Sequence, residues 1–214
     1  MTIVEEPDLA TLAEEAAEHL ADDPELGYPV PAEELEVEPE VPVLRLAIAM
    51  GATTIAAAVM VGGIFIGITP RIHAAIGGVL GIALGARAAQ LRRAAVSTAV
   101  IVGGLFAIGL ITLMIASPAD IARVTGLVQE AARDGDVLRP PVRYVAGWAA
   151  IVGWLMGAVG FTAIWTAVTF RKPSLGLLVP VPVLGIAAIS VPKSAQLASG
   201  LVCVVLFAAG LGLL

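Results

Sequence analysis

The stretch LAIAMGATTIAAAVMVGGIFIGI, residues 46–68, runs for 23 residues without a charged side chain and lies between Arg45 and Arg71. As a helix it would be about 34 Å long at 1.5 Å per residue, which is enough to cross the hydrocarbon core of a bilayer. The stretch therefore predicts a membrane-spanning helix and sets the class of the chain around it.

Five more apolar segments follow the first along the chain. We expect helices at residues 72–90, 94–116, 144–170, 174–191 and 194–214. The composition points the same way, because 58% of the residues are hydrophobic and only 14% are charged, whereas soluble domains are about half apolar and about a quarter charged. The predicted fold class is all-α, a polytopic membrane helical bundle of about six transmembrane helices over residues 45–214.

An acidic segment precedes the predicted bundle. Fourteen of the eighteen acids lie between Glu5 and Glu40, interspersed with prolines, and such a composition disfavours a packed fold. We expect residues 1–44 to form an acidic, mostly disordered tail with a possible short helix at 7–21. The tail is either a docking peptide for a protein partner or a solvated, self-repelling segment.

Cations in the short connections indicate which way the bundle faces. The doublets at 92–93 and 171–172 lie on the side of the tail, whereas the short connections on the opposite side carry single cations. The positive-inside rule makes the side of the tail cytoplasmic, so we predict a multi-pass plasma-membrane protein with a cytoplasmic N-terminus. The chain has no basic patch with interleaved aromatic residues, which argues against nucleic-acid binding.

Aromatic residues mark the two ends of the segment at 144–170. Trp148 near its start and Trp165 near its end would lie roughly 25 Å apart along a helix. That separation suits the two interfacial belts of a bilayer. The predicted interfacial anchors are Tyr144, Trp148, Trp165, Arg92, Arg93, Arg171 and Lys172.

Glycines recur at helical spacing in two of the segments. Gly77, Gly81 and Gly85 are four residues apart, and so are Gly153 and Gly157. A stripe of this kind lets the backbone of another helix approach closely. We expect these glycines to pack helices against one another within the chain, and an oligomer formed through the same faces stays open.

The longest connection holds a predicted amphipathic helix at about 118–133. Ser117 suits an N-cap and Pro118 suits the first helical position, while Ile121 and Val124 share one helix face. We expect this helix to lie along the membrane surface or to cover a neighbouring loop.

Two prolines interrupt RKPSLGLLVPVPVLGIAAISVPK, residues 171–193. Pro180 and Pro182 each remove a backbone donor and would kink a helix. We expect an irregular entry after Pro173 and a shorter helix near 183–191, covered by neighbouring helices because freed carbonyls need partners in a membrane. A broken helix can also line a transport site, so the alternative function is a subunit of a transporter or of a larger membrane complex.

The side chains that usually carry chemistry are scarce in the apolar segments. Ion and proton pathways generally use ionisable groups within the membrane, and none lies deep in a segment here. The single cysteine, Cys203, completes no metal-ligand set, and no zinc-protease, redox-cysteine, P-loop or serine-elbow motif occurs. We therefore expect no catalytic residue, no cofactor, no metal site and no enzyme activity in this chain alone.

The order of features from residue 118 onward is similar to that of a known family. PADIARVTGLVQEAARDGDVLRPPV (118–142) precedes a long apolar segment that runs into TAVTFRKPSLGLLVPVPVLGIAAISVP (166–192). This order resembles the N-terminal membrane region of bacterial transglutaminase-like membrane proteins. The resemblance covers roughly residues 45–214 and is specific only over roughly 118–193.

The resemblance implies an anchoring role in the cell envelope. Members of that family carry an extracytoplasmic domain with a Cys-His-Asp arrangement beyond these helices, and this chain has no such domain. Cys203 cannot replace that nucleophile, so no catalytic residue carries over. Because the last apolar segment reaches Leu214 without a polar flank, we expect the membrane half of a cell-envelope protein, either trimmed or naturally free-standing. The predicted function is a non-catalytic integral membrane anchor or scaffold that contacts lipid and protein partners.

Overall fold

In the described part of the chain, the regular secondary structure is helical apart from one isolated bridge between Phe65 and Val142. A computed structural model describes residues 42–91, 94–135 and 139–214. The predicted tail helix and two predicted anchors, Arg92 and Arg93, lie outside the described residues. The all-α, polytopic class predicted from the sequence is confirmed.

Prolines open several of the helices. Pro70, Pro118, Pro173 and Pro182 each occupy the first turn of a helix, where the missing N–H would have no partner in any case. In chain order the described helices are α2 (Val43–Gly62), α3 (Thr69–Ala88), α4 (Ala94–Ala116), the 3-10 helix η2 (Pro118–Arg123), α5 (Val124–Gly135), α6 (Ala146–Thr169), α7 (Pro173–Leu178), α8 (Val181–Ser190) and α9 (Lys193–Gly212).

Five of the described segments are long and apolar enough to cross a membrane. They are α2, α6, α9, the Ser97–Ala116 part of α4, and α7 together with α8. The sequence predicted about six spans, and the segment that is not among the five is α3. Its four glycines, together with Arg71, His73 and Arg87, make it less apolar than its neighbours. Multi-pass membrane character is therefore established, while a sixth crossing by α3 stays a prediction.

α2 ends at Gly62, earlier than the sequence predicted. Beyond it, the N–H of Ile66 donates to the carbonyl oxygen of Val142 at 3.0 Å, and the N–H of Val142 donates to that of Ile64 at 3.0 Å. Gly67 has a φ of 95°, a left-handed conformation that glycine adopts without steric cost. The predicted helix is thus too long, because contacts from a distant segment satisfy the backbone of a turn.

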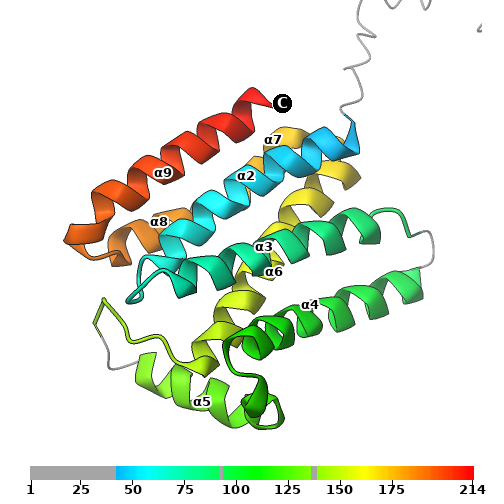
Figure 1. Cartoon of the computed structure of the whole chain (residues 1–214). Helices are drawn as coiled ribbons and strands as arrows, with labels where there is room; N and C mark the ends of the chain where they lie inside the picture. The colour runs from blue at the N-terminus through cyan, green and yellow to red at the C-terminus, as the bar shows by residue number, and fades with distance from the viewer. Residues whose placement is uncertain (1–41, 92–93, 136–138) are drawn as a thin grey trace, which may run out of the picture. The chain divides into compact units, whose positions relative to one another are not determined.

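The long helices run back and forth between two ends of the bundle (Figure 1). At the end that we call A, α2 begins and α9 finishes, and Arg45 Nε donates to the carbonyl oxygen of Leu213. The opposite end, B, holds the α2–α3 turn, η2, α5 and the α8–α9 turn. α3 lies in the middle, where it contacts α2, α4 and α6.

Buried side chains form two clusters along the bundle. One cluster gathers around the α2–α3 turn and includes Phe65, Val152 and Met156. The other lies nearer end A and includes Met50 and Ile164. Because α2, α3 and α6 contribute to both clusters, these three helices connect the halves of the bundle.

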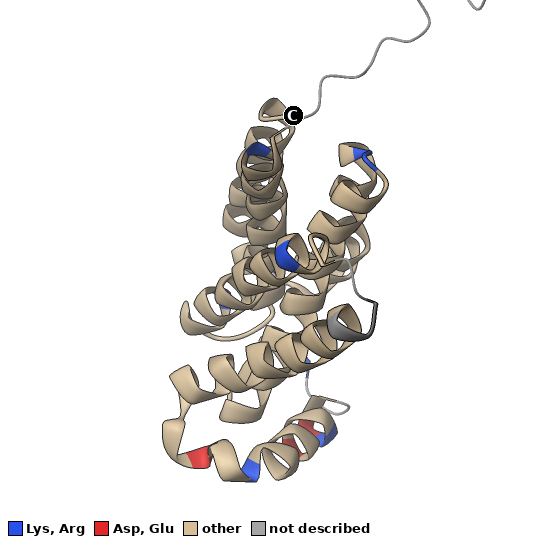
Figure 2. Ribbon diagram, turned by 90° about the vertical axis from the view of Figure 1, so that its right-hand side faces the viewer, with Lys and Arg blue, Asp and Glu red and all other residues tan. Residues whose placement is uncertain are grey.

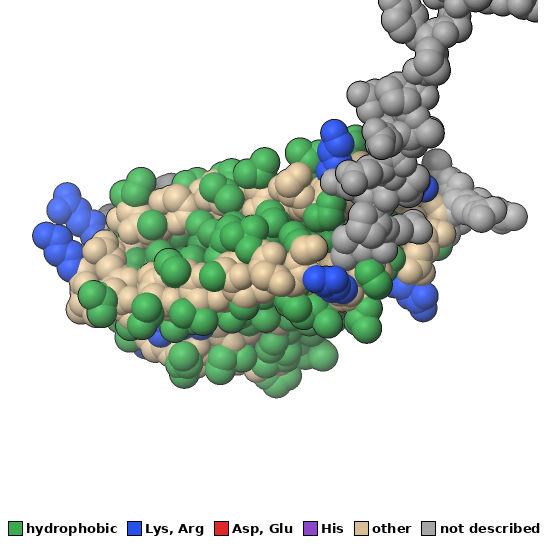
Figure 3. Space-filling view, turned by 90° about the horizontal axis from the view of Figure 1, so that it is seen from above, with side chains coloured by type: hydrophobic (Ala, Val, Ile, Leu, Met, Phe, Trp, Pro, Cys, Tyr) green, Lys and Arg blue, Asp and Glu red, His purple; other side chains and the backbone are tan. Residues whose placement is uncertain are grey.

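The outside of the bundle is largely apolar. Ile189 on α8 is 87% exposed and Leu197 on α9 is 85% exposed. In Figure 3 hydrophobic side chains spread across the face while Lys and Arg gather at its two ends, and in Figure 2 the acids lie on the η2–α5 segment. An apolar belt with cations at its rims is the pattern of a surface that contacts lipid.

Candidate functional site

Glycines bring the backbones of α3 and α6 into direct contact. A Cβ added at Gly77 would lie 2.7 Å from the carbonyl oxygen of Gly153, and a Cβ added at Gly81 would overlap that of Gly157. Small residues permit such approaches in membrane bundles, where packing replaces the hydrophobic driving force. The structure thus brings four of the five predicted packing glycines together in one seam.

The α3–α6 seam continues toward end A. A Cβ at Gly85, the fifth predicted glycine, would lie 2.6 Å from the carbonyl oxygen of Phe161, and a Cβ at Gly160 would overlap that of Gly78. Gly78 and Gly160 were not among the glycines predicted from the sequence to pack helices. The available signal was the three-residue step from Gly157 to Gly160, which keeps both glycines on one helix face.

Polar contacts attach α4 to the outer side of α6. Thr112 Oγ1 on α4 lies 2.9 Å from the carbonyl oxygen of Ala149 and donates to it, next to Gly153, where a Cβ would lie 2.8 Å from Thr112 Cγ2. Trp154 Nε1 donates to the carbonyl oxygen of Phe106 at 3.1 Å, and the two rings stack with centroids 6.1 Å apart. Gly153 and Trp154 thus hold α4 in place on α6.

The amphipathic helix covers the start of α6. Ala131 is fully buried, and a Cβ at Gly147 would overlap the carbonyl oxygen of Leu127. The predicted helix was expected to lie along the membrane surface or to cover a neighbouring loop. The observed contact is with the helix α6, and a position at the membrane surface stays a prediction. The predicted single helix at 118–133 is in fact the 3-10 helix η2 followed by α5. Ser117 bonds the carboxylate of Asp120 at 2.7 Å, so its hydroxyl does not cap the helix backbone.

An aromatic cluster at end B contains Phe65, His73, Tyr144 and Trp148. The centroid of Phe65 lies 5.3 Å from those of Tyr144 and Trp148, and the Tyr144 hydroxyl is hydrogen-bonded to His73 Nδ1 at 2.9 Å. Tyr144 precedes α6, and burial raises the pKa of its phenol above the ordinary value, so the phenol is protonated at neutral pH. Two of the predicted anchors thus join the α2–α3 turn to α3 and α6.

The other described anchors lie toward end A. Trp165 stacks on Phe161 of the same helix with ring centroids 6.2 Å apart. Arg171 and Lys172 are exposed in the turn between α6 and α7. The structure therefore separates these three side chains from Tyr144 and Trp148 along α6.

The proline break divides the predicted fifth segment into α7 and α8. The expected irregular entry is wrong, because Pro173 sits in the first turn of a short helix that lasts to Leu178. The chain then turns at Val179 and Pro180 before α8 begins. Pro180 is buried and Pro182 is exposed. The break therefore falls at Val179–Pro180, and Pro182 opens the next helix.

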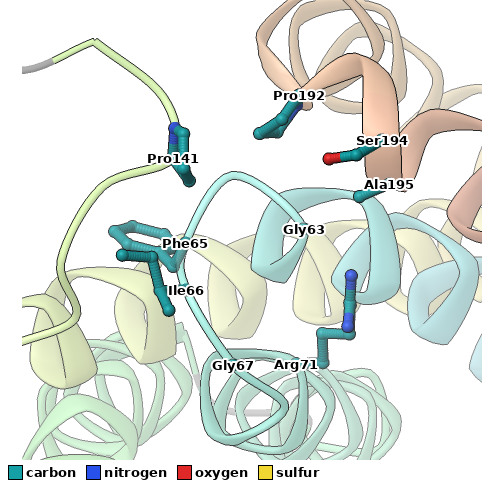
Figure 4. A pocket seen from close by; sticks show the side chains of 9 residues that line it. All are labelled: Gly63, Phe65, Ile66, Gly67, Arg71, Pro141, Pro192, Ser194 and Ala195. Atoms are coloured by element: carbon teal, nitrogen blue, oxygen red, sulfur yellow. The ribbon is translucent and has the colours of Figure 1, made fainter.

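A cavity of about 270 Å³ opens at end B, where three connections meet (Figure 4). Its walls include Phe65 from the α2–α3 turn, Pro141 from the segment before α6, and Ser194 from the start of α9, with Arg71 on α3. A second cavity of about 730 Å³ lies at end A between α3 and α4. Within the described ranges, no three His, Cys, Asp or Glu side chains form a metal-binding group.

Comparisons with protein-family models, curated proteins and solved structures find no match for this chain. The fold and the contacts above define its class as an all-α, multi-pass membrane protein with a glycine-lined interior seam. The resemblance noted in the sequence stays a prediction.

Proposed function

We propose that the chain is a non-catalytic membrane anchor or scaffold, which holds its acidic N-terminal segment at one face of the plasma membrane for a protein partner. The observation that carries this proposal is the seam between α3 and α6. Not even a Cβ fits between the two backbones at Gly81 or Gly160. Helices in such close contact cannot slide or separate without repacking, and a scaffold requires that rigidity.

Buried polar side chains support the same function. Thr53 Oγ1 donates to the carbonyl oxygen of Met50 at 3.0 Å. The single proton of the Thr112 hydroxyl is shared between the carbonyl oxygens of Gly109 on α4 and Ala149 on α6, each 2.9 Å away. These hydroxyls are used to bond the bundle's own backbone, which lowers the cost of burying them. Both threonines therefore have a structural role inside the bundle.

The covered proline break also favours packing over transport. Gly176 on α7 lies so close to α6 that a Cβ would be 2.5 Å from the carbonyl oxygen of Ala163 and 2.8 Å from Ala167 Cβ. Pro180 is buried at the break itself. Because the break is packed against α6 at Gly176 and is buried at Pro180, we assign it to helix packing.

Location and orientation are part of the proposal. The exposed Arg171 and Lys172 at end A support a cytoplasmic position for that end under the positive-inside rule. The resemblance to the membrane region of transglutaminase-like proteins supports a place in the cell envelope. Together they favour an acidic segment that meets its partner in the cytoplasm.

Removal of residues 1–40 tests the scaffold directly. This deletion leaves the compact unit from Val41 onward intact. We expect the full chain, purified in mild detergent from its native membrane, to carry a stoichiometric partner that the shortened chain lacks. The comparison uses quantitative mass spectrometry, with equal thermal stability of the two chains as the control. Recovery of both chains without a partner, or of both with the same partner, would contradict the proposal.

A further inference from the structure

We propose that the cavity at end B is a phosphate-binding site built around Arg71. Figure 4 shows the Arg71 side chain extending from the start of α3 toward Ser194 and Ala195 at the start of α9. The ligand is a phosphate oxyanion, which either a lipid headgroup or a soluble phosphate can supply. Neither the anchoring role nor the glycine seam requires such a site.

Among the described residues, no acidic side chain forms an ion pair with the partly enclosed Arg71. Its side chain is partly buried, and its Nη2 donates to the hydroxyl of Ser199 at 3.3 Å. Its Nε is buried and has no hydrogen-bond partner within the described structure. Since a guanidinium is always charged, and an enclosed charge is costly unless it is paired, an anion in the cavity that Arg71 lines would lower the cost of enclosing this charge.

The position of Arg71 is fixed by the fold. A Cβ at Gly62 would lie 2.5 Å from Arg71 Cα and 2.6 Å from its Cγ, so the arginine stem packs directly on the end of α2. Ser199, which accepts the hydrogen bond from Arg71, is itself only 3% exposed. The guanidinium is therefore held by two helices and by its hydroxyl partner, as a preorganised binding group should be.

The start of α9 adds a second, independent source of positive potential. Ser194 and Ala195 line the cavity, and α9 begins at Lys193. The N–H of Ala195 donates to the carbonyl oxygen of Pro192 at 2.9 Å, whereas that of Ser194 comes earlier in the first turn, where N–H groups have no acceptor within their own helix. The helix dipole also favours an anion there. The ammonium of Lys193 adds another positive charge on the same turn.

The chemistry of the cavity favours a phosphate. The acids that the structure describes lie on η2 and α5, and none of them lines the cavity. A guanidinium, the backbone N–H of Ser194 and the Ser194 hydroxyl together suit a tetrahedral oxyanion that accepts several hydrogen bonds. The volume of about 270 Å³ leaves room for several waters beside it, since each water occupies about 30 Å³ in the liquid.

Thermal unfolding of the purified full chain in phospholipid-free detergent tests the site. At matched ionic strength, inorganic phosphate should raise the Tm of the wild type by about 5 °C relative to chloride, because a ligand that binds only the folded state stabilises it. Arg71→Gln should abolish this rise. Arg143→Gln, which removes an exposed cation at the same end, should leave it unchanged.

A second variant keeps the test informative if Arg71→Gln fails to fold. Ser194→Glu places a carboxylate at the mouth of the cavity, so it should raise the Tm in chloride and remove the response to phosphate. If the wild type responds to added phospholipid but not to inorganic phosphate, and Arg71→Gln loses that response, the phosphate comes from a lipid headgroup. An equal response of wild type and Arg71→Gln, or no response of the wild type to either probe, would overturn the proposal.

Discussion

Gly81→Leu should prevent the bundle from folding. The new side chain would have to enter space that the backbone of Gly157 already occupies, and backbone cannot move aside as a flexible side chain can. Overpacked cores lose about 1–3 kcal/mol when side chains can adjust, and a backbone collision exceeds that range. We expect only a small fraction of the protein to remain monodisperse in size-exclusion chromatography. The Tm should drop by more than 10 °C, since each kcal/mol of lost stability lowers the Tm by about 2–4 °C.

Gly103→Leu is the matched control for this substitution. Gly103 lies on α4, and no atom lies within 4 Å of the place where its Cβ would be. The same glycine-to-leucine change there adds an apolar side chain to the open surface and improves helix propensity by about 1 kcal/mol. We expect a wild-type elution profile and an unchanged or higher Tm. Equal behaviour of the two variants would show that the α3–α6 seam does not hold the bundle together.

Trp154→Ala should loosen α4 from the rest of the bundle. The indole stacks on Phe106 and donates to its carbonyl oxygen, and it also fills the space beside Gly109. Loss of a packed tryptophan costs about 3–5 kcal/mol, and its partial exposure places the expected loss near the lower end. Hydrogen exchange should rise across α4 more than across α2 and α3.

Trp165→Ala is the matched control for Trp154→Ala. Trp165 lies on the same helix, but its stacking partner, Phe161, is on α6 as well, so no other helix depends on that ring contact. We expect a loss of at most about 1 kcal/mol and unchanged exchange in α4. If both variants destabilise α4 equally, the contact between Trp154 and Phe106 is not what attaches that helix.

The spacing of small and apolar residues was enough to predict the helical class and the packing role of the glycines. Hydropathy alone placed α4 and α9 within two residues of their observed bounds. Gly77 and Gly81 stood out because helical periodicity puts them on one face. The sequence could not show that Gly153 and Gly157 are their partners, because a stripe of glycines does not identify the helix that packs against it.

The misplaced boundaries share a physical cause. Residues 63–68 are as apolar as the helix before them, yet the pairing with Val142, which is distant in sequence, turns them out of α2. Pro173 was expected to disrupt the chain, whereas its place in the first turn of α7 costs no hydrogen bond. Long-range pairing and the register of a proline within a helix are both set by the tertiary structure.

The cavity around Arg71 was not visible in the sequence. In the sequence, Arg71 looks like an ordinary cation flanking an apolar segment, and Ser194 and Ser199 look like small residues within one. Only the fold brings the starts of α3 and α9 together, at a site assembled from residues more than 120 positions apart. Sites of this kind need a structure before they can be proposed.

The most direct test of the membrane bundle is to determine on which side of the membrane each end of α3 lies. Single cysteines introduced at Ile68 and Gln90, which are exposed on either side of α3, can be probed with an impermeant maleimide in a Cys203→Ser background. In sealed, right-side-out membrane vesicles we predict labelling of Ile68→Cys from outside and of Gln90→Cys only after permeabilisation. Labelling of both cysteines from the same side would contradict a bundle in which α3 is a central, membrane-crossing helix.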